Sequence, residues 1–188
     1  MAYSTSHKIL VQASDRQIPM DLIWNVVCFT TKWDHPTMWA HYANNYKGIC
    51  LGYSKKVLDE EVSLINKNAP NPTYSIKSAF LVPMEYVDSI PQAFRSIEEP
   101  LAIKTKHWMY EDEWRLGMLY SYGNVSIREK GSPHPIKNAL KEIIYTDQLK
   151  TNELIAIKNI ARQANPAIKF FKIELSKGIR KITRIEVK

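Results

Sequence analysis

Two glutamates and an arginine alternate within residues 104–120, whose sequence is KTKHWMYEDEWRLGMLY. If this part of the chain is extended, Glu111, Glu113 and Arg115 share one face, because alternate side chains of a strand point the same way. Paired carboxylates can polarise a hydroxyl group or hold a substrate, since their repulsion raises the pKa of one of them. The simpler interpretation, which the pattern alone favours, is an ordinary ion pair between Glu113 and Arg115 on a solvated sheet face.

A second candidate segment, residues 28–53, is rich in aromatic side chains and contains two histidines. Trp39, Tyr42 and Tyr46 have the spacing of one helical face, which is more often core than binding pocket. We interpret Trp39 as a core residue, whereas Tyr42 could equally belong to a pocket, because a tyrosine hydroxyl needs a polar neighbour. His41 lies off the apolar stripe, and a lone histidine of this kind is more often a surface residue than a catalyst.

The elements around the second segment follow from its apolar pattern. A continuous apolar run predicts a buried strand at residues 22–30. A helix is predicted over residues 37–46, with Thr37 as its N-cap. Gly48 is expected to follow the end of this helix, and residues 49–53 form the next apolar strand. Aromatic side chains therefore gather where a strand ends and a helix begins, which is a common place for a pocket.

The elements around the glutamate pair are a helix predicted at residues 98–108 and a strand at residues 114–120. Residues 80–87 read as an edge strand, because Pro83 cannot donate a hydrogen bond to a neighbour. The other expected elements are a helix at 55–65, a loop at 68–73, a mobile connection at 123–135, a helix at 152–163, and strands at 140–145, 168–175 and 179–187.

This order of elements indicates an α+β fold, because strands and helices do not alternate strictly. The expected sheet is mixed, mostly antiparallel and split, with short helices on its flanks. A chain of 188 residues fits one hydrophobic core, so we expect a single domain over residues 1–188 with a polar N-terminal segment at residues 1–21.

The composition is that of a globular protein, with 45% hydrophobic and 24% charged residues and only 6 glycines. It excludes the collagen-like, coiled-coil and low-complexity classes. Lys and Arg number 26 against 19 Asp and Glu, for a formal net charge of +7, and much of the excess lies in the last third of the chain. A basic C-terminal region could recruit nucleic acid or an acidic protein, although strands with solvated basic edges explain it at least as well.

Cysteine use and hydropathy bear on the compartment. Cys28 and Cys50 lie in apolar runs and are expected to be buried free thiols. No His and Cys spacing suggests zinc, so we expect no structural metal. The chain has no apolar run long enough to span a bilayer and no apolar leader at its N-terminus. These features predict a cytoplasmic protein without membrane contact.

Residues 38–53 and 104–115 resemble the two hallmark motifs of an uncharacterised bacterial family, domain-of-unknown-function family twenty-nine seventy-one. The first motif reads MWAHYANNYKGICLGY and the second KTKHWMYEDEWR. The strand, helix and strand expected from Ile136 onward are also similar to that family. The resemblance implies an association with phage defence and abortive infection but no agreed activity. The family's usual opening, with an Asn-Asp-Pro motif, is not found here, which implies a fragment or a naturally shortened member.

A more distant resemblance is to the ADP-ribosyltransferase fold. Those enzymes place an aromatic or Ser-Thr-Ser strand before a helix with an aromatic residue, and a glutamate, often in a Glu-x-Glu pair, at the start of a later strand. The matching residues here are, in chain order, Phe29, Thr30, Thr31, Tyr42, Glu111 and Glu113. The resemblance implies NAD as the cofactor and transfer of its ADP-ribosyl group.

The same resemblance implies a role for each matching residue. Glu113 would hydrogen-bond the nicotinamide ribose and stabilise the oxocarbenium-like transition state, while Glu111 would orient the acceptor. The Arg or His that those enzymes supply from their first strand has only His7 and Arg16 as weak counterparts. The two threonines would support the pocket, and the aromatic residues would wall the nicotinamide ring. The expected cofactor-binding residues are Phe29, Thr30, Thr31, Tyr42, His41 and Arg115.

Three functions remain open at this stage. The first is an NAD-dependent ADP-ribosyltransferase-like effector, in defence or as a toxin, and we place it first because the aromatic wall and the paired glutamates occur in the right chain order. The second is a metal-assisted nuclease that uses Glu111, Glu113, His41 and Lys104 around a divalent ion, with the basic C-terminal region contacting phosphates. The third is a non-catalytic defence or regulatory module in which the Glu113–Arg115 pair is architectural.

Overall fold

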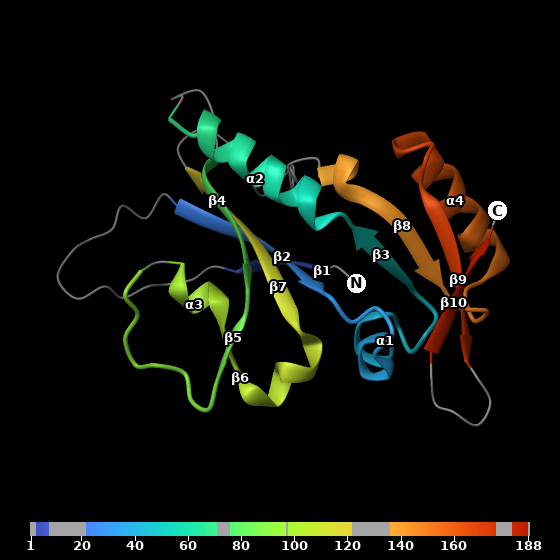
Figure 1. Ribbon diagram of the computed structural model, residues 1–188, viewed down its shortest axis with the longest axis horizontal. Coiled ribbons are helices and arrows are strands. Elements are labelled where there is room, and N and C mark those ends of the chain that lie inside the picture. The colour runs from blue at the N-terminus through green and yellow to red at the C-terminus, as the bar shows by residue number, and fades with distance from the viewer. Residues whose placement is uncertain are drawn as a thin grey trace. The chain divides into compact units, whose positions relative to one another are not determined.

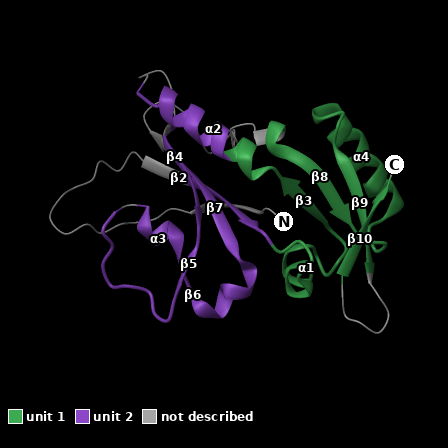
Figure 2. Cartoon of the chain, viewed as in Figure 1, with its two compact units in different colours: residues 1–2, 32–58, 135–188 green, residues 3–31, 59–134 purple. Residues whose placement is uncertain are grey.

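The computed structural model describes residues 3–7, 22–70, 76–96, 98–121, 136–175 and 182–187 (Figure 1). The chain forms two compact units, which we describe one at a time (Figure 2). Unit 1 comprises Met1–Ala2, Lys32–Leu58 and Pro135–Lys188, and unit 2 comprises Tyr3–Thr31 and Asp59–His134. The connection expected at residues 123–135 lies outside the described residues.

The main sheet of unit 2 has four antiparallel strands in the order β1-β2-β7-β4. The apolar run predicted to be a strand is β2, with the predicted bounds. The predicted edge strand is divided at Met84, and the part that ends at Pro83 does lie at the edge of the sheet. The four strands are β1 (Tyr3–His7), β2 (Leu22–Thr30), β7 (Glu113–Ser121) and β4 (Ile76–Pro83).

The core of unit 2 forms where the central strands meet a short helix. Val26, Cys28 and Leu101 are buried together, and Phe80 packs against them. Gly117 lies opposite Phe80 in the β4–β7 ladder, and a Cβ atom there would lie only 2.3 Å from the Phe80 ring. A glycine at this position therefore makes room for an aromatic side chain that the core uses.

The segment before β7 differs from the predicted helix over residues 98–108. Only α3 (Glu99–Ala102) is α-helical, and it is followed by a short strand, β6 (Ile103–Thr105), and a 3₁₀ helix, η1 (Lys106–Glu111). Strand β6 pairs in parallel with β5 (Glu85–Val87). This long-range pairing buries Ile103 and overrides the local helical pattern, which is why the prediction was wrong.

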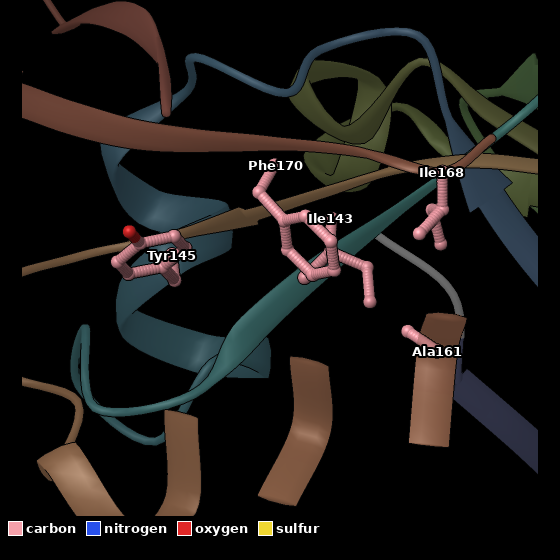
Figure 3. Close-up of a cluster of buried hydrophobic side chains, with 5 residues drawn as sticks. All are labelled: Ile143, Tyr145, Ala161, Ile168 and Phe170. Atoms are coloured by element: carbon pink, nitrogen blue, oxygen red, sulfur yellow. The ribbon is translucent and has the colours of Figure 1, made fainter. Parts of the chain in front are cut away.

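Unit 1 contains a second four-stranded sheet, in the order β10-β9-β8-β3. Strands β8 and β9 are parallel and are joined through α4 (Thr151–Ala164). Ala161 of this helix belongs to a buried cluster with Ile143, Tyr145, Ile168 and Phe170 (Figure 3). The strand predicted at residues 49–53 and the strand predicted at residues 140–145 are confirmed. The strands are β3 (Ile49–Tyr53), β8 (Leu140–Tyr145), β9 (Lys169–Leu175) and β10 (Ile182–Val187), and a 3₁₀ turn, η3 (Ile136–Ala139), precedes β8.

The helix of the aromatic segment, α1 (Pro36–Tyr42), is shorter than predicted, and His35 rather than Thr37 is its N-cap. After Tyr42 the chain makes a left-handed turn, with φ of 48° and 51° at two asparagines, Asn44 and Asn45. Asparagine tolerates this region better than most residues, which explains the early end of the helix. Trp39 is 0% exposed and therefore core, as predicted.

Helix α2 (Lys55–Asn68) begins in unit 1 and continues into unit 2, three residues beyond its predicted end. Within unit 2, the Asn66 side chain forms two hydrogen bonds with the backbone of Ala79 in β4, with lengths of 2.9 Å and 2.8 Å. The fold class is α+β with mostly antiparallel sheets, as predicted; the single domain stays a prediction. None of the helices in the described part of the chain is long and apolar enough to cross a membrane.

Candidate functional site

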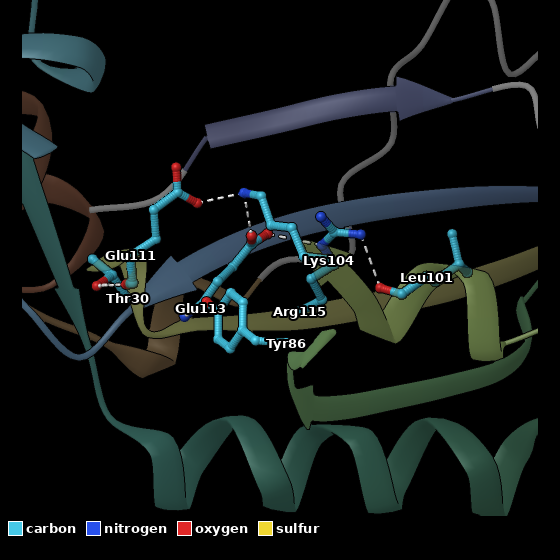
Figure 4. Close-up of polar contacts among 7 residues, drawn as sticks. All are labelled: Thr30, Tyr86, Leu101, Lys104, Glu111, Glu113 and Arg115. Atoms are coloured by element: carbon cyan, nitrogen blue, oxygen red, sulfur yellow. Dashed lines mark hydrogen bonds and ion pairs between the residues drawn. The ribbon is translucent and has the colours of Figure 1, made fainter. Parts of the chain in front are cut away.

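Four charged side chains meet where β7 begins, and we call them the charge cluster: Lys104, Glu111, Glu113 and Arg115 (Figure 4). Lys104 Nζ lies 2.8 Å from Glu113 Oε2 and also binds Glu111 Oε2. Arg115 Nε donates to Glu113 Oε1 over 2.8 Å. Two carboxylates thus face two cations, so the charges of the cluster balance.

Both glutamates of the charge cluster are buried, with Glu111 1% and Glu113 3% exposed. The ion pair between Glu113 and Arg115 exists as predicted, but the expectation that it lies on a solvated sheet face is wrong. The reason is the segment from α3 to β6, which contacts this face: Arg115 Nη1 donates to the carbonyl oxygen of Leu101 over 2.9 Å, and Lys104 comes from β6. The carboxylates have therefore exchanged water for fixed cations.

The cations determine how Glu113 ionises. Burial opposes its charge, but hydrogen bonds from Arg115, Lys104 and Cys28 outweigh burial and hold the pKa of Glu113 below its ordinary value. Burial likewise opposes the charge of Lys104, and the bonds to Glu111 and Glu113 outweigh it, so that the pKa of Lys104 is raised. The sequence argument expected repulsion between the glutamates to raise one pKa, and for Glu113 the direction is the opposite.

The backbone at Glu113 is held by neighbouring residues of the same unit. The Glu113 N–H donates to the Tyr86 hydroxyl oxygen, and the Met84 N–H donates to the Glu113 carbonyl oxygen, each over 2.8 Å. Asp112, which precedes it, has a left-handed φ of 45°. The Thr31 hydroxyl binds the Asp112 carboxylate. The turn from η1 into β7 is thus fixed by contacts to the Asp112 side chain and to the Glu113 backbone.

Several predicted site residues come together at this turn. In the β2–β7 ladder Thr30 lies opposite Glu113, and Phe29 lies opposite Trp114. The Thr30 hydroxyl also donates to the carbonyl oxygen of Glu111. The structure therefore brings both glutamates, both threonines, Phe29 and Arg115 to the adjacent ends of two strands.

The other predicted residues are not part of this group. Tyr42 and His41 belong to α1 in unit 1, where their rings contact each other edge to face at 6.1 Å. His41 is exposed, in agreement with a surface histidine. Arg16 lies outside the described residues, and only the backbone of His7 is described.

Three neighbours of the charge cluster were not expected from the sequence. Tyr86 lies opposite Lys104 in the short β5–β6 ladder, Cys28 hydrogen-bonds Glu113, and the Trp108 ring lies 4.8 Å from Lys104 Nζ. Among the three functions considered from the sequence, only the nuclease gave Lys104 a role. A parallel pair of three-residue strands leaves no periodic signal, so local pattern could not place Tyr86 and Lys104 side by side.

The charge cluster does not have the donor set of a metal centre. In the described ranges, no three His, Cys, Asp or Glu side chains are grouped so as to hold a metal ion. The positive charge between Glu111 and Glu113 is the ammonium group of Lys104. Cys28 and Cys50 are buried thiols that form no disulfide, as predicted.

Comparison with known proteins gives one match. Residues 38–116 match the family described as Protein of unknown function (DUF2971), which confirms the predicted resemblance over that segment. The match includes both aromatic-rich motifs and the charge cluster, covers less than half of the 188 residues, and ends before the C-terminal part that also seemed similar. No curated protein and no solved structure matched the chain. The matched family is described as having no known function, so the chemistry must be argued from the site.

Proposed function

We propose that the protein is an NAD-dependent ADP-ribosyltransferase-like effector in which Glu113 stabilises the transition state. The observation that supports this most is the environment of Glu113, a buried carboxylate held as an anion at the start of a strand. Breaking the glycosidic bond of NAD places positive charge on the ribose. A fixed anion in a site with little water stabilises such charge more strongly than a solvated one.

The reaction balances without a metal or redox partner. The bond between ribose C1′ and the nicotinamide nitrogen breaks, and its electron pair stays with nicotinamide, which leaves as a neutral molecule. A hydroxyl group of the acceptor, or of water, forms the new bond to C1′ and releases its proton. Glu113 faces the ribose in this scheme, and Glu111 orients the acceptor.

The neighbouring residues have supporting roles in the proposal. Thr30 lies opposite Glu113 and binds the Glu111 backbone, so it keeps the two acidic residues in register. Phe29 lies opposite Trp114 and therefore on the other face of the sheet from Glu113, so it has no part in the proposed reaction. The Arg115 side chain is 18% exposed, and its charge would attract the diphosphate of NAD. The setting in bacterial defence rests on the family resemblance alone.

The target of the ADP-ribosyl transfer stays open, because the basic C-terminal region does not distinguish nucleic acid from an acidic protein. Two of its basic residues are paired with acids, since Arg184 binds Glu142 and Lys169 binds Glu186. Lys177, Arg180, Lys181 and Lys188 of that region lie outside the described residues. Nucleic acid and an acidic protein are both compatible with a formal net charge of +7.

One observation favours a non-catalytic function instead. Both carboxylate oxygens of Glu113 bind a cation of the same chain, Arg115 at Oε1 and Lys104 at Oε2. A buried, charge-balanced cluster of this kind can be purely architectural. In that case Glu113→Gln should reduce stability without affecting any activity.

Isothermal titration with NAD, combined with chromatography of released nicotinamide, tests the proposed function. We expect the wild-type protein to bind NAD and release nicotinamide, and Glu113→Gln to lose at least about 10²-fold in turnover. Glu142→Gln is the matched control, because it alters another ion-paired glutamate, in unit 1. Absence of NAD binding by wild-type protein, together with no effect of Glu113→Gln on transfer or glycohydrolysis, would overturn the proposal.

A further inference from the structure

Lys104 lies at the centre of the charge cluster, although the proposed chemistry gives it no role. Its ammonium group contacts the carboxylates of both Glu111 and Glu113 (Figure 4). Each carboxylate belongs to a different element, η1 or β7, and Lys104 comes from a third, β6. One side chain therefore ties together the two acidic residues on either side of the left-handed turn at Asp112.

The surroundings of Lys104 fix its ammonium group in this position. The β5–β6 ladder places it opposite Tyr86, whose hydroxyl binds the Glu113 backbone. The face of the Trp108 ring lies 4.8 Å from Nζ, and the Lys104 side chain is only 17% exposed. An ammonium group between carboxylates and an indole face interacts far more strongly than one in water.

We propose that Lys104 is a positioning residue that acts through Glu113, fixing the orientation of its carboxylate for the reaction at the ribose. The catalytic meaning of this role rests on the proposed function. Without Lys104, Glu113 keeps Arg115 and the Cys28 thiol as donors but faces the carboxylate of Glu111 with no cation between them. Like charges at close range favour uptake of a proton, so Glu113 would lose its anionic form as the pH falls sooner than in the wild-type protein.

Besides Lys104, four residues of the same unit lie next to Glu113. Arg115 on β7 and Cys28 on β2 stabilise its charge through hydrogen bonds. The carboxylate of Glu111 on η1 carries a charge of the same sign and binds the same Lys104 ammonium group. Tyr86 on β5 binds its backbone, and burial raises the pKa of that tyrosine above its ordinary value, so it stays protonated at neutral pH. The group whose acid titration reports on Lys104 is therefore Glu113.

Two variants and a control test the role of Lys104. Lys104→Met removes the charge but keeps the length of the side chain, and Lys104→Arg restores a cation. Lys106→Met is the control, because Lys106 pairs with the exposed Asp88 on the surface. NMR of the ¹³C-labelled carboxyl group of Glu113 should show titration at higher pH in Lys104→Met, a return toward wild type in Lys104→Arg, and no change in Lys106→Met.

The turnover of NAD should follow the same order. We expect Lys104→Met to lose about tenfold or more at mildly acidic pH, with a smaller loss at neutral pH, because the anion of Glu113 is then recovered. A purely structural role would lower turnover equally at all pH values. If wild-type protein shows no NAD turnover while the Glu113 titration still moves in Lys104→Met, the proposed function fails and the link between Lys104 and Glu113 stands.

A measurement on the wild-type protein covers the case in which Lys104→Met does not fold. The ¹⁵N resonance of Lys104 Nζ should change at the pH at which the Glu113 carboxyl carbon titrates, because the two groups share a hydrogen bond of 2.8 Å. Independent titration of the two resonances would overturn the inference. So would an unchanged Glu113 titration in folded Lys104→Met.

Discussion

Each unit contains an ion pair between an arginine and a glutamate, within β7 in unit 2 and between β10 and β8 in unit 1, and the two pairs are built differently. In unit 2, Arg115 and Glu113 are 2.8 Å apart, and the carboxylate side chain is 2% exposed. In unit 1, Arg184 and Glu142 are 2.6 Å apart, but their side chains are 27% and 26% exposed. Similar distances thus occur in very different surroundings.

The aromatic neighbours show what the exposed pair does. The Arg184 guanidinium lies over the rings of Trp33 and Phe171, at 4.7 Å and 4.4 Å from their centroids. Arg184 thereby stabilises the sheet through stacking as well as through charge. The charge cluster, by contrast, holds carboxylates that have lost water and depend on their cations. The Glu113–Arg115 and Glu142–Arg184 pairs therefore differ in burial and not in distance.

The largest expected effect is the loss of one cation from the charge cluster. Arg115→Met leaves Glu113 buried with one cation fewer, which should lower the free energy of unfolding by about 3–5 kcal/mol. Urea unfolding followed by tryptophan fluorescence measures this loss. A cost below about 1 kcal/mol would show that water reaches the cluster, and the contrast between the two pairs would disappear.

A glycine in unit 1 provides the next test. A Cβ atom at Gly52 would lie 2.2 Å from Glu142 Cγ, so Gly52→Ala should displace Glu142 from Arg184. We expect a cost of about 1–3 kcal/mol in unfolding free energy. In a double variant with Glu142→Ala the cost should be smaller, because the clash is gone. Equal costs in the two backgrounds would mean that Gly52 acts through its backbone instead.

The pH dependence of the unfolding free energy in acid further distinguishes the buried Glu113–Arg115 pair. The pKa of Glu113 in the folded protein is below its ordinary value of 4.5, so the unfolded chain binds that proton more tightly. The contribution of Glu113 to stability is therefore complete above about pH 4.5 and is lost as the pH falls through the lowered value. In Glu113→Gln the unfolding free energy should fall less steeply as the pH is lowered. In Lys106→Met it should fall as steeply as in the wild-type protein. An equally steep fall in Glu113→Gln and in the wild-type protein would show that Glu113 does not cause the loss of stability in acid.

The smallest effect is expected at the exposed pair. Glu142→Gln keeps the shape of the side chain and removes only its charge, so the unfolding free energy should fall by less than about 1 kcal/mol. Added salt should reduce this difference, because partly exposed charges are screened. A loss as large as that of Arg115→Met would contradict the distinction between the two pairs.

Much of the fold could be predicted from apolar runs. The strands at residues 22–30, 49–53 and 140–145 have the predicted bounds, and each contains a short run of apolar residues that favours a strand. The helix at residues 37–46 was too long, since periodicity does not reveal the left-handed turn at Asn44.

The candidate site was predicted only in part. Alternation placed Glu113 and Arg115 on one face of a strand. The strand register places Thr30, to which the resemblance to ADP-ribosyltransferases gave a supporting role, opposite Glu113. The burial of the glutamates and the central place of Lys104 could not be predicted. Both depend on the parallel pairing of β5 with β6, a contact between segments that local sequence patterns do not connect.

The account is tested most directly by the rate at which nicotinamide is released from NAD by wild-type protein and by Glu113→Gln, with both shown to be folded by circular dichroism. We predict measurable release by the wild-type protein and a rate at least about 10²-fold lower in the variant. No release by the wild-type protein, or equal rates in both proteins, would contradict the claim that Glu113 acts on NAD and would leave the charge cluster an architectural feature.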